Sequence, residues 1–355
     1  MANILQNLQI IILNSNILVL KKRIQAFAQL GAYLRSSDHS GDFFLEQIEL
    51  RNPWYTRENV NLQLRTIGEN LQPDKLTDWL SGVPDQPVDK TVGLILAGNL
   101  PLVGFHDIMC VLLTGFKASI KTSSEDAGLT HYVVEKLIEL EPAFAEKIEL
   151  VEQLKQFDLV IATGSNNSAR YFDYYFGKYP HIIRKNRNSV AILSGDETPE
   201  ELHALGRDIF DYFGMGCRSV SKLFVPQSYP LERLLDQLEP FAPIAGHTKY
   251  RNNYDFNKSL YLINKDPHLD NGFLLLREHS ALSSPLAVVH YEVYGDLQQL
   301  SAELQSFSED IQLVVTNCSI DTGDIPQFAL GDAQRPGLND YADNVNTLDF
   351  LIKNQ

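Results

Sequence analysis

The pattern of apolar and polar positions divides the chain into a helical N-terminal part and a longer part in which strands and helices alternate. Between residues 20 and 34, apolar side chains recur every three or four positions, which predicts an amphipathic helix. Residues 41–70 favour a helical or mixed segment with a turn at Asn52-Pro53. The first regular element is therefore expected to pack one face against a core that later segments supply.

From residue 90 onward, short apolar runs alternate with stretches of helical spacing. We predict strands at residues 91–97, 116–120 and 157–162, and helices at residues 105–113, 127–140 and 167–176. This alternation is the sequence form of a doubly wound parallel sheet. Ligands of such sheets bind beyond the carboxyl ends of the strands, so the turns at Asn99, Lys121 and Gly164 are expected to share one crevice.

A second block of the same kind begins near residue 188. Strands are predicted at residues 189–193, 222–226, 285–294 and 311–316, and helices at residues 200–213 and 231–238. A chain of 355 residues exceeds the size at which one hydrophobic core usually stops growing. Two α/β lobes are therefore the expected fold class.

The net charge of −15 at pH 7 changes the list of plausible partners. A strongly negative surface repels phosphate backbones, so no nucleic-acid partner is expected, although local sites can still bind anionic cofactors. No apolar run is long enough for a membrane span. The apolar residues among the first twenty precede Lys21-Lys22-Arg23, the reverse of a signal peptide. Residues 1–20 are therefore interpreted as a buried or partner-covered strand or helix, or as an N-terminal extension outside the fold.

Cysteine and histidine usage argues against bound metal. The three cysteines are far apart without a CxxC pair, and the nine histidines show no HxxxH or HExxH spacing. We therefore expect no disulfide framework, no metal site and a cytoplasmic location.

One cysteine lies in a glycine-rich turn, Gly214-Met215-Gly216-Cys217. The glycines permit close approach of a substrate, and Arg218 adds positive potential beside a thiol, which favours the reactive thiolate. The alternative is a small buried apolar cysteine, which we accept for Cys110 and favour for Cys318. The turn alone does not decide between these two interpretations.

Four motifs in order decide it. They are A-G-N-L-P-L-V-G at 97–104, I-K-T-S-S at 120–124, A-T-G-S at 162–165 and G-M-G-C-R-S at 214–219, followed by G-L-N-D-Y at 337–341. With these motifs, the chain resembles the aldehyde dehydrogenase superfamily over roughly residues 20–350. It resembles most closely the acyl-CoA reductases related to the long-chain fatty-acid reductase of bacterial luminescence.

The resemblance implies an aldehyde-dehydrogenase-like fold with the active site between two lobes. It implies a cofactor-binding domain at 21–187, a catalytic domain at 188–325, and a segment at 326–355 that returns to the first domain or makes an oligomer contact. Cys217 matches the nucleophile, and Asn99 matches the asparagine that holds the oxyanion with the cysteine N–H. The alternative for Asn99 is a turn residue before Leu-Pro.

The resemblance also implies a nicotinamide cofactor site. Lys121 matches the lysine that binds the adenosine ribose, and Gly164 and Ser165 match the turn at the pyrophosphate-binding helix, with Ser123 and Thr163 in the same motifs. The alternatives are a solvated lysine and an ordinary helix cap at Ser165.

Cofactor preference follows from the third residue after the lysine. Members that prefer NAD often carry a glutamate there, and this chain has Ser124, which leaves room for a 2′-phosphate. NADPH is therefore expected rather than NADH, although Glu125 and Asp126 follow immediately.

A second departure concerns water activation. Oxidising members carry a glutamate that deprotonates water, and the matching position here falls at about Arg184. Without that base, hydrolysis of an acyl-enzyme is expected to be slow, which favours reduction. The basic run at 184–187 either attracts phosphates or is a solvated loop. The aromatic run at 171–179 is interpreted as the packing face of a helix in preference to an acyl tunnel.

These observations predict NADPH-dependent reduction of a long-chain acyl-CoA, or of an acylated partner protein, to the aldehyde. A homo-oligomer or a complex with an acyl-protein synthetase is the expected assembly. The alternatives are a cysteine acyltransferase or thioesterase without nicotinamide, a non-catalytic subunit that only binds a partner synthetase, and an acyl phosphate reductase.

Overall fold

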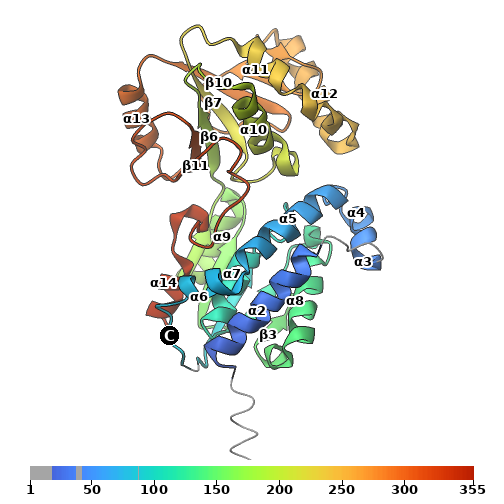
Figure 1. Cartoon of the computed structure of the whole chain (residues 1–355), viewed down its shortest axis with the longest axis vertical. Helices are drawn as coiled ribbons and strands as arrows, with labels where there is room; N and C mark the ends of the chain where they lie inside the picture. The colour runs from blue at the N-terminus through green and yellow to red at the C-terminus, as the bar shows by residue number, and fades with distance from the viewer. Residues whose placement is uncertain (1–17, 37–41, 87) are drawn as a thin grey trace, which may run out of the picture. The chain divides into compact units, whose positions relative to one another are not determined.

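The computed structural model describes residues 18–36, 42–86 and 88–355, so nearly all of the expected extension at 1–20 lies outside the described residues. The chain forms two compact units (Figure 1). Unit 1 comprises residues up to Lys185 together with 337–339 and 345–355, and unit 2 comprises 186–336 with 340–344. The C-terminal segment is thus divided between the units, and the first boundary falls at Lys185 where the sequence placed it at 187.

Unit 1 is built on a five-stranded sheet in which every neighbouring pair is parallel. Its strands, in spatial order, are β3 (Ile148–Leu150), β2 (Lys117–Lys121), β1 (Thr91–Ile95), β4 (Leu159–Thr163) and β5 (His181–Arg184). The three central strands carry buried apolar runs, as expected for a parallel sheet covered on both faces.

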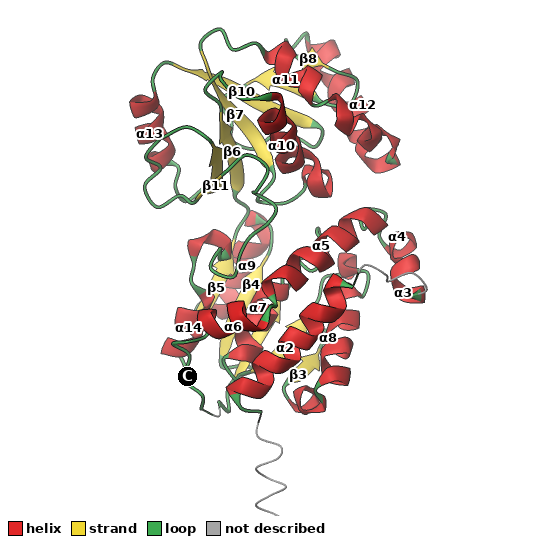
Figure 2. Ribbon diagram, viewed as in Figure 1, coloured by secondary structure: helices red, strands yellow, loops and turns green. Residues whose placement is uncertain are grey.

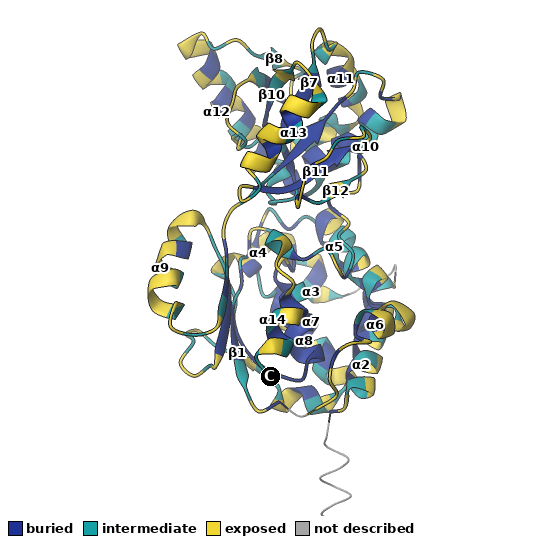
Figure 3. Cartoon of the chain, turned by 90° about the vertical axis from the view of Figure 1, so that its left-hand side faces the viewer, coloured by how far each residue is buried: buried dark blue, intermediate teal, exposed yellow. Residues whose placement is uncertain are grey.

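The helices of unit 1 cover both faces of that sheet (Figures 2 and 3). On one face, α2 (Leu20–Arg35) packs against α7 (Phe105–Leu113) and α8 (Leu129–Leu140), and α9 (Asn166–Phe176) lies against β4 and β5 on the other. The remaining helices of the unit are α3 (Phe43–Glu46), α4 (Ile48–Arg51), α5 (Arg57–Asn70), α6 (Pro73–Trp79), η1 (Ser124–Asp126), η2 (Pro142–Glu146) and α14 (Thr347–Lys353).

Unit 2 contains a seven-stranded sheet that is parallel except at one edge, where the last strand in spatial order is antiparallel. Its strands, in spatial order, are β12 (Gln327–Phe328), β11 (Ile311–Thr316), β6 (Asn188–Ile192), β7 (Val220–Pro226), β10 (Val288–Tyr294), β9 (Leu275–Glu278) and β8 (Leu269–Asp270). Two doubly wound lobes were expected, and the parallel sheets confirm the predicted fold class.

Two hydrophobic cores lie on opposite faces of the sheet in unit 2. One contains residues of α10 (Pro199–Phe210) and α11 (Leu231–Gln237), and the other contains residues of α13 (Leu297–Ser306). The alternation along β7 explains the division, because Leu223 belongs to the first core and Phe224 to the second. The unit also contains η3 (Asp211–Gly214), η4 (Glu239–Gly246), α12 (Thr248–Asn264) and η5 (Ala342–Asn344).

One difference from the sequence prediction lies at the end of α10, next to the cysteine turn. The helix was expected to continue to residue 213, but it ends at Phe210. Tyr212 and Phe213 adopt left-handed backbone conformations, with φ of 54° and 60°, which a continuous right-handed helix does not allow. The helix therefore ends just before the cysteine turn.

Candidate active site

Three turns of unit 1 lie at one edge of its sheet. β1 is hydrogen-bonded in parallel to both β2 and β4, with Ile95 opposite Lys121 on one side and Ala162 on the other. The segments that follow these strands, at Asn99 and at Gly164, therefore leave the sheet at the same edge as Lys121. The three motifs thus share an edge of the sheet, and their joint lining of one crevice stays a prediction.

The turn that carries Asn99 is held by close backbone packing. A Cβ on Gly98 would lie 2.8 Å from the Cβ of Ser123 and 2.8 Å from the backbone nitrogen of Asp126, so no larger residue fits without a shift. The buried Tyr55 hydroxyl lies 3.0 Å from the carbonyl oxygen of Gly98 and 2.9 Å from that of Leu100, and donates a hydrogen bond to them. Asn99 itself is exposed at the tip of this braced turn.

The turn after β4 begins helix α9. Ser165 caps it, because its hydroxyl accepts a hydrogen bond from the backbone N–H of Ser168 at 3.3 Å. A Cβ on Gly164 would lie 2.8 Å from the Cβ of Ser168 and 2.9 Å from the ring of Phe172, so the chain turns tightly onto the helix. The cap and an anion site are compatible, since the first-turn N–H groups of a helix point beyond its N-terminus. Thr163 is the half-buried last residue of β4.

The turn after β2 carries the other expected cofactor residues. Ser123 is the N-cap of η1 and accepts a hydrogen bond from the Glu125 N–H at 3.2 Å, so its hydroxyl has a structural partner. Ser124 and Glu125 are exposed, Lys121 is half-buried, and Asp126 is buried against Thr130. The exposed Ser124 leaves this edge open where a glutamate would add negative charge.

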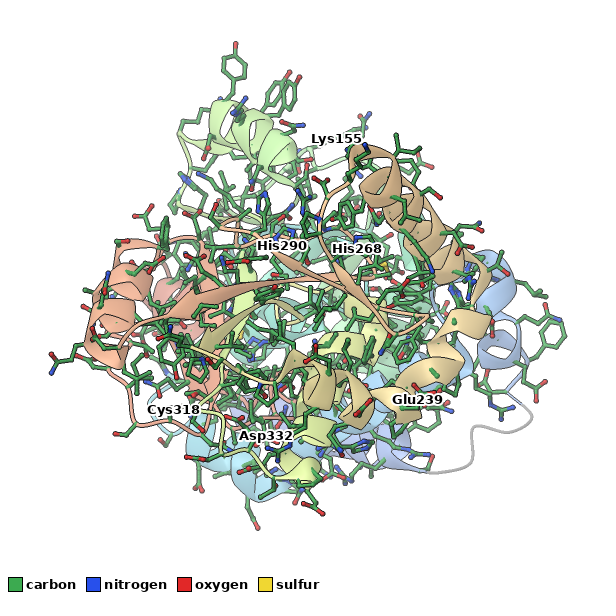
Figure 4. All side chains as sticks on the ribbon, turned by 90° about the horizontal axis from the view of Figure 1, so that it is seen from above. Lys155, Glu239, His268, His290, Cys318 and Asp332 are labelled. Carbon is green, nitrogen blue, oxygen red and sulfur yellow. The ribbon has the colours of Figure 1, made fainter. Side chains whose placement is uncertain are left out.

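A cavity of about 410 Å³ lies on the same face of this sheet as the Lys121 side chain. Ser119 lines the cavity, and side chains two positions apart on a strand project to the same face. The other lining residues are Glu149, Val151, Glu152, Gln153, Lys155 and Gln156, of which Lys155 is labelled in Figure 4. Sequence analysis missed this cavity, because β3 is only three residues long and its apolar pattern is weak.

In unit 2, Cys217 occupies the second position of a four-residue turn. The Ser219 N–H donates to the Gly216 carbonyl at 3.0 Å, which closes a β-turn with Cys217 and Arg218 at its centre. The Ser219 hydroxyl accepts from the Gly216 N–H at 3.2 Å, and the Ser189 hydroxyl donates to the Cys217 carbonyl at 2.8 Å. The backbone on both sides of the half-buried cysteine is thus held by side-chain hydroxyls.

The segment before this turn has an unusual backbone. Tyr212, Phe213 and Gly214 have φ of 54°, 60° and 74°, and two of these residues carry large buried side chains. The ring of His247, which caps α12, lies 4.2 Å from the Phe213 ring, measured between centroids. Left-handed conformations of bulky residues cost free energy and collect at functional sites. This cluster supports the prediction that the glycine-rich turn has a functional role.

The other two cysteines fit the structural interpretation. Cys110 is fully buried in α7, and burial raises the pKa of its thiol well above the ordinary value, which disfavours a reactive thiolate. Cys318 follows β11 and lies half-buried beside the Ile192 carbonyl (Figure 4). His290 is buried on β10, its Nδ1 lies 3.0 Å from the Ala281 carbonyl oxygen, and burial lowers its pKa.

The two arginines of the basic run at 184–187, of which Arg184 ends β5, bond to groups inside the protein. Arg184 is 4% exposed and donates to the Asp107 carboxylate at 2.6 Å and to the Thr347 hydroxyl at 2.9 Å. Arg187 donates to the carbonyls of Ser308 and Ile311. Both predictions for the arginines of this run are therefore wrong, because their charges have partners inside the protein.

The aromatic run is only partly a packing face. Phe172 and Phe176 are half-buried, and the Phe176 ring lies edge-on to Phe157 at 5.7 Å. The tyrosines at 171, 174 and 175 are 67%, 83% and 61% exposed (Figure 3). The predicted packing role is wrong for these tyrosines, and they line no internal tunnel.

Neither a metal-binding cluster nor a membrane-spanning helix is found among the residues that the structure describes. Among them, no cluster of three or more histidine, cysteine, aspartate or glutamate side chains could hold a metal ion. None of the helices described is long and apolar enough to cross a membrane. Asn99 belongs to unit 1 and Cys217 to unit 2, so their joint role stays a prediction.

Comparison with known proteins places this geometry in context. No protein-family model matches the chain. A long-chain acyl-protein thioester reductase from Aliivibrio fischeri is 26% identical over 217 residues, which cover 54% of this chain and 44% of the relative. The chain thus matches less than half of that relative's length.

Solved structures share the fold. An NAD-dependent benzaldehyde dehydrogenase from Corynebacterium glutamicum is similar with a TM-score of 0.66 at 13% identity, over 94% of this chain and 83% of that chain. An acetylating aldehyde dehydrogenase from Geobacillus thermoglucosidasius gives 0.63 at 12%, over 93% and 89%. The chain therefore has an aldehyde-dehydrogenase-like fold and is similar in sequence to a long-chain acyl-protein thioester reductase, which confirms the resemblance found in its motifs.

Proposed function

We propose that this protein is an oxidoreductase that reduces a long-chain acyl thioester to the aldehyde, with Cys217 as nucleophile and NADPH as hydride donor. The observation that carries the proposal is the cysteine turn, in which Cys217 is half-buried and the hydroxyls of Ser189 and Ser219 bond to the backbone on its two sides. The similar relative's own name, acyl-protein thioester reductase, supports this reaction class.

Cys217 forms and releases the covalent intermediate. Its thiolate attacks the thioester carbonyl, the carbon–sulfur bond to the donor breaks, and the donor thiol leaves with a proton. The amide of Asn99 and the Cys217 N–H are proposed to hold the oxyanion, each contributing roughly 3–4 kcal/mol to lowering the barrier. After reduction, Cys217 departs as thiolate and the aldehyde is released.

The edge of the sheet in unit 1 suits a dinucleotide. The α9 N-terminus attracts pyrophosphate, Lys121 offers a charge for the ribose or its 2′-phosphate, and the cavity over Ser119 offers space for the adenosine. A nicotinamide cofactor held there by the motifs at 121–124 and 163–165 supplies the hydride for the acyl-enzyme. The exposed Ser124 supports NADPH over NADH.

The residue at position 184 bears on whether water hydrolyses the proposed acyl-enzyme. At the position where oxidising relatives activate water, this chain places an arginine that is buried and paired with Asp107. A guanidinium cannot accept a proton, so it provides no base for hydrolysis. We propose that the acyl-enzyme persists until hydride transfer. The donor is acyl-CoA or an acylated partner protein, and a homo-oligomer or a complex with an acyl-protein synthetase is the proposed assembly.

One labelling experiment tests the reaction. The protein is incubated with labelled long-chain acyl-CoA, the label is located by mass spectrometry, and NADPH is then added. We expect the label on Cys217 and its release as aldehyde after NADPH. Cys217→Ser should abolish both, whereas Cys318→Ala, the matched control at the other half-buried cysteine, should retain them.

Four outcomes would overturn the proposal. Release of free acid at the same rate without NADPH indicates a thioesterase, and transfer to an acceptor without NADPH indicates an acyltransferase. Absence of both label and aldehyde with the native protein indicates a non-catalytic role for this chain. Faster reduction of an acyl phosphate than of the thioester assigns the other substrate class.

A further inference from the structure

The segment after β12 contacts the cysteine turn closely. We call residues 329–336 of unit 2 the strap; Asp332, labelled in Figure 4, lies within it. The strap contains Gly331, whose φ of +94° belongs to the left-handed region that favours glycine. It makes hydrogen bonds in two directions, to α10 and to the turn at 216–219.

Asp208 anchors the strap to α10. Its carboxylate is fully buried and accepts hydrogen bonds from the backbone N–H groups of Gly331 at 2.6 Å and Ala333 at 3.0 Å. Each of the two oxygens accepts one bond, and a carboxyl oxygen keeps acceptor capacity whether or not the group carries a proton. Two such bonds from one side chain fix both the position and the direction of this part of the strap.

Arg218 joins the strap to the cysteine turn. One guanidinium nitrogen donates to the Ala333 carbonyl at 3.3 Å and the other to the Asp340 carbonyl at 3.0 Å. The guanidinium also lies over the ring of Phe328, 5.3 Å from its centroid. Ala333 therefore links Asp208, through its N–H, to Arg218, through its carbonyl.

A second connection runs beside the first. The buried Gln334 amide donates to the Ser219 hydroxyl at 3.0 Å, and this hydroxyl also accepts from the Gly216 N–H at 3.2 Å. Cys217 lies between Gly216 and Ser219, so consecutive strap residues hold the two flanks of the cysteine. Movement of the strap would therefore be transmitted to the turn.

We propose that Arg218 is a positioning residue that, through the strap anchored by Asp208, fixes the orientation of Cys217 and keeps a positive charge beside its sulfur. The proposal rests on the proposed function, because it assumes that Cys217 is the nucleophile. The strap lies 110 or more residues from the cysteine turn in sequence, and it would orient the thiol before substrate binds.

The electrostatics of Arg218 agree with this geometry. Burial lowers its pKa, while Cys217 and Asp340 raise it, which places the guanidinium within electrostatic range of the cysteine. An arginine keeps its proton even when buried, so the charge persists at every working pH. A persistent cation beside a thiol stabilises the thiolate.

Alkylation of Cys217 tests the proposal without substrate or cofactor. The rate of modification by iodoacetamide is measured against pH by quantifying the Cys217 peptide, and hydrogen–deuterium exchange reports on residues 329–336. For Arg218→Met we expect the alkylation midpoint to rise by about one pH unit, the rate at pH 7 to fall about tenfold and strap exchange to accelerate. Arg218→Lys should keep the midpoint near that of the native protein but still accelerate exchange, since one ammonium does not reproduce the planar fork.

Two further variants separate positioning from general destabilisation. Gln334→Met removes one strap-to-turn hydrogen bond at nearly constant volume, and Asp208→Asn weakens the anchor. Both should lower the limiting alkylation rate about twofold to threefold without moving the midpoint. Arg233→Met is the matched control, because Arg233 donates to the Glu197 carbonyl at 2.8 Å elsewhere in unit 2, and it should leave both readouts unchanged.

Unchanged alkylation and exchange in Arg218→Met would overturn the proposal. So would equal effects in Arg233→Met, or a normal limiting rate in Gln334→Met if the Arg218 variants fail to fold. Failure of the proposed function is distinguishable: if Cys217 responds to Arg218 but no acyl label attaches, the reductase assignment fails while the positioning role stands.

Discussion

The two units hold their important turns by different physical means. In unit 1, glycines at 98 and 164 leave no room for a Cβ, and a buried tyrosine hydroxyl braces the backbone, so shape fixes the edge of the sheet. In unit 2, the cysteine turn depends on a buried aspartate and a half-buried arginine bonded to backbone groups. Charged side chains therefore support the proposed nucleophile, whereas close packing supports the proposed cofactor edge.

Two arginines make the same contrast. Arg184 of unit 1 is buried and bonds to a carboxylate at 2.6 Å, which neutralises its charge within the core. Arg218 of unit 2 is half-buried, and its hydrogen bonds go to two carbonyl oxygens, which carry only partial charges. We infer that unit 1 should respond mainly to changes of volume or pairing, and unit 2 to changes of charge and pH.

The largest expected effect comes from breaking the Arg184–Asp107 ion pair of unit 1. Arg184→Leu leaves the Asp107 carboxylate buried without its cation, which should lower the free energy of unfolding by about 3–5 kcal/mol. The double variant Arg184→Leu/Asp107→Leu should regain most of this loss, because an apolar pair leaves no buried charge. Urea denaturation measures both. A single variant that costs less than about 1 kcal/mol would show that the pair is not the buried unit described.

The next prediction concerns Asp208 and pH. Burial raises the pKa of its carboxyl from 3.8 to about 7, against the opposing hydrogen bonds from Gly331 and Ala333, with Asp211 raising it further and Arg207 lowering it. Because the folded-state pKa lies above that of the unfolded chain, the folded state binds this proton more tightly. Its contribution to stability is complete below pH 4 and is lost as pH rises to about 7.

Asp208→Asn removes this titration. The stability of the native protein should fall across that interval by on the order of 4 kcal/mol more than that of the variant. Urea denaturation of both proteins at pH 4, 5, 6, 7 and 8 measures the difference, which should grow by about 1.4 kcal/mol per pH unit up to pH 7. Parallel pH profiles for the two proteins would mean that Asp208 does not titrate in this range, and the contrast between the units would weaken.

A smaller effect is expected from the packed edge of unit 1. Gly98→Ala places a Cβ against Ser123 and Asp126, so the turn must shift, and NADPH binding should weaken about tenfold. Gly82→Ala is the matched control, since nothing lies within 4 Å of the added atom. Fluorescence titration with NADPH measures both variants. Iodoacetamide alkylation of Cys217 should stay unchanged in each, and a loss of thiol reactivity in Gly98→Ala would contradict the separation of the two mechanisms.

The sequence predicted the parts of this picture that local pattern determines. Apolar runs placed β1, β2 and β4, and parallel pairing then required the turns at Asn99, Lys121 and Gly164 to share an edge. The glycine-rich turn identified the reactive cysteine candidate, although the left-handed conformation extends to Tyr212 and Phe213, where no local signal predicts it.

Contacts between residues far apart in the chain could not be predicted from the sequence. The partner of Arg184 lies 77 residues away, and Asp208 bonds to a residue 125 positions later. Spacing within one element carries no information about such contacts, because they depend on how whole elements pack. A buried arginine, an isolated aspartate on a helix and a strap without regular structure therefore resembled surface features.

The smallest expected effect tests whether charge matters at the edge of unit 1 as well. Ser124 is exposed three residues after Lys121, and Ser124→Glu adds a carboxylate where a 2′-phosphate is proposed to bind. Repulsion of the 2′-phosphate should weaken NADPH binding only about fivefold, because charges in a solvent-exposed site are strongly screened. NADH lacks this phosphate, so its binding should change little. Ser124→Gln keeps the added volume without the charge and should therefore show less than half of that loss of affinity. The ratio of the two cofactor affinities, measured at low and high salt, checks the mechanism. If Ser124→Gln and Ser124→Glu reduce NADPH binding equally, volume rather than charge governs this position too. Close packing would then control the whole of this edge of unit 1.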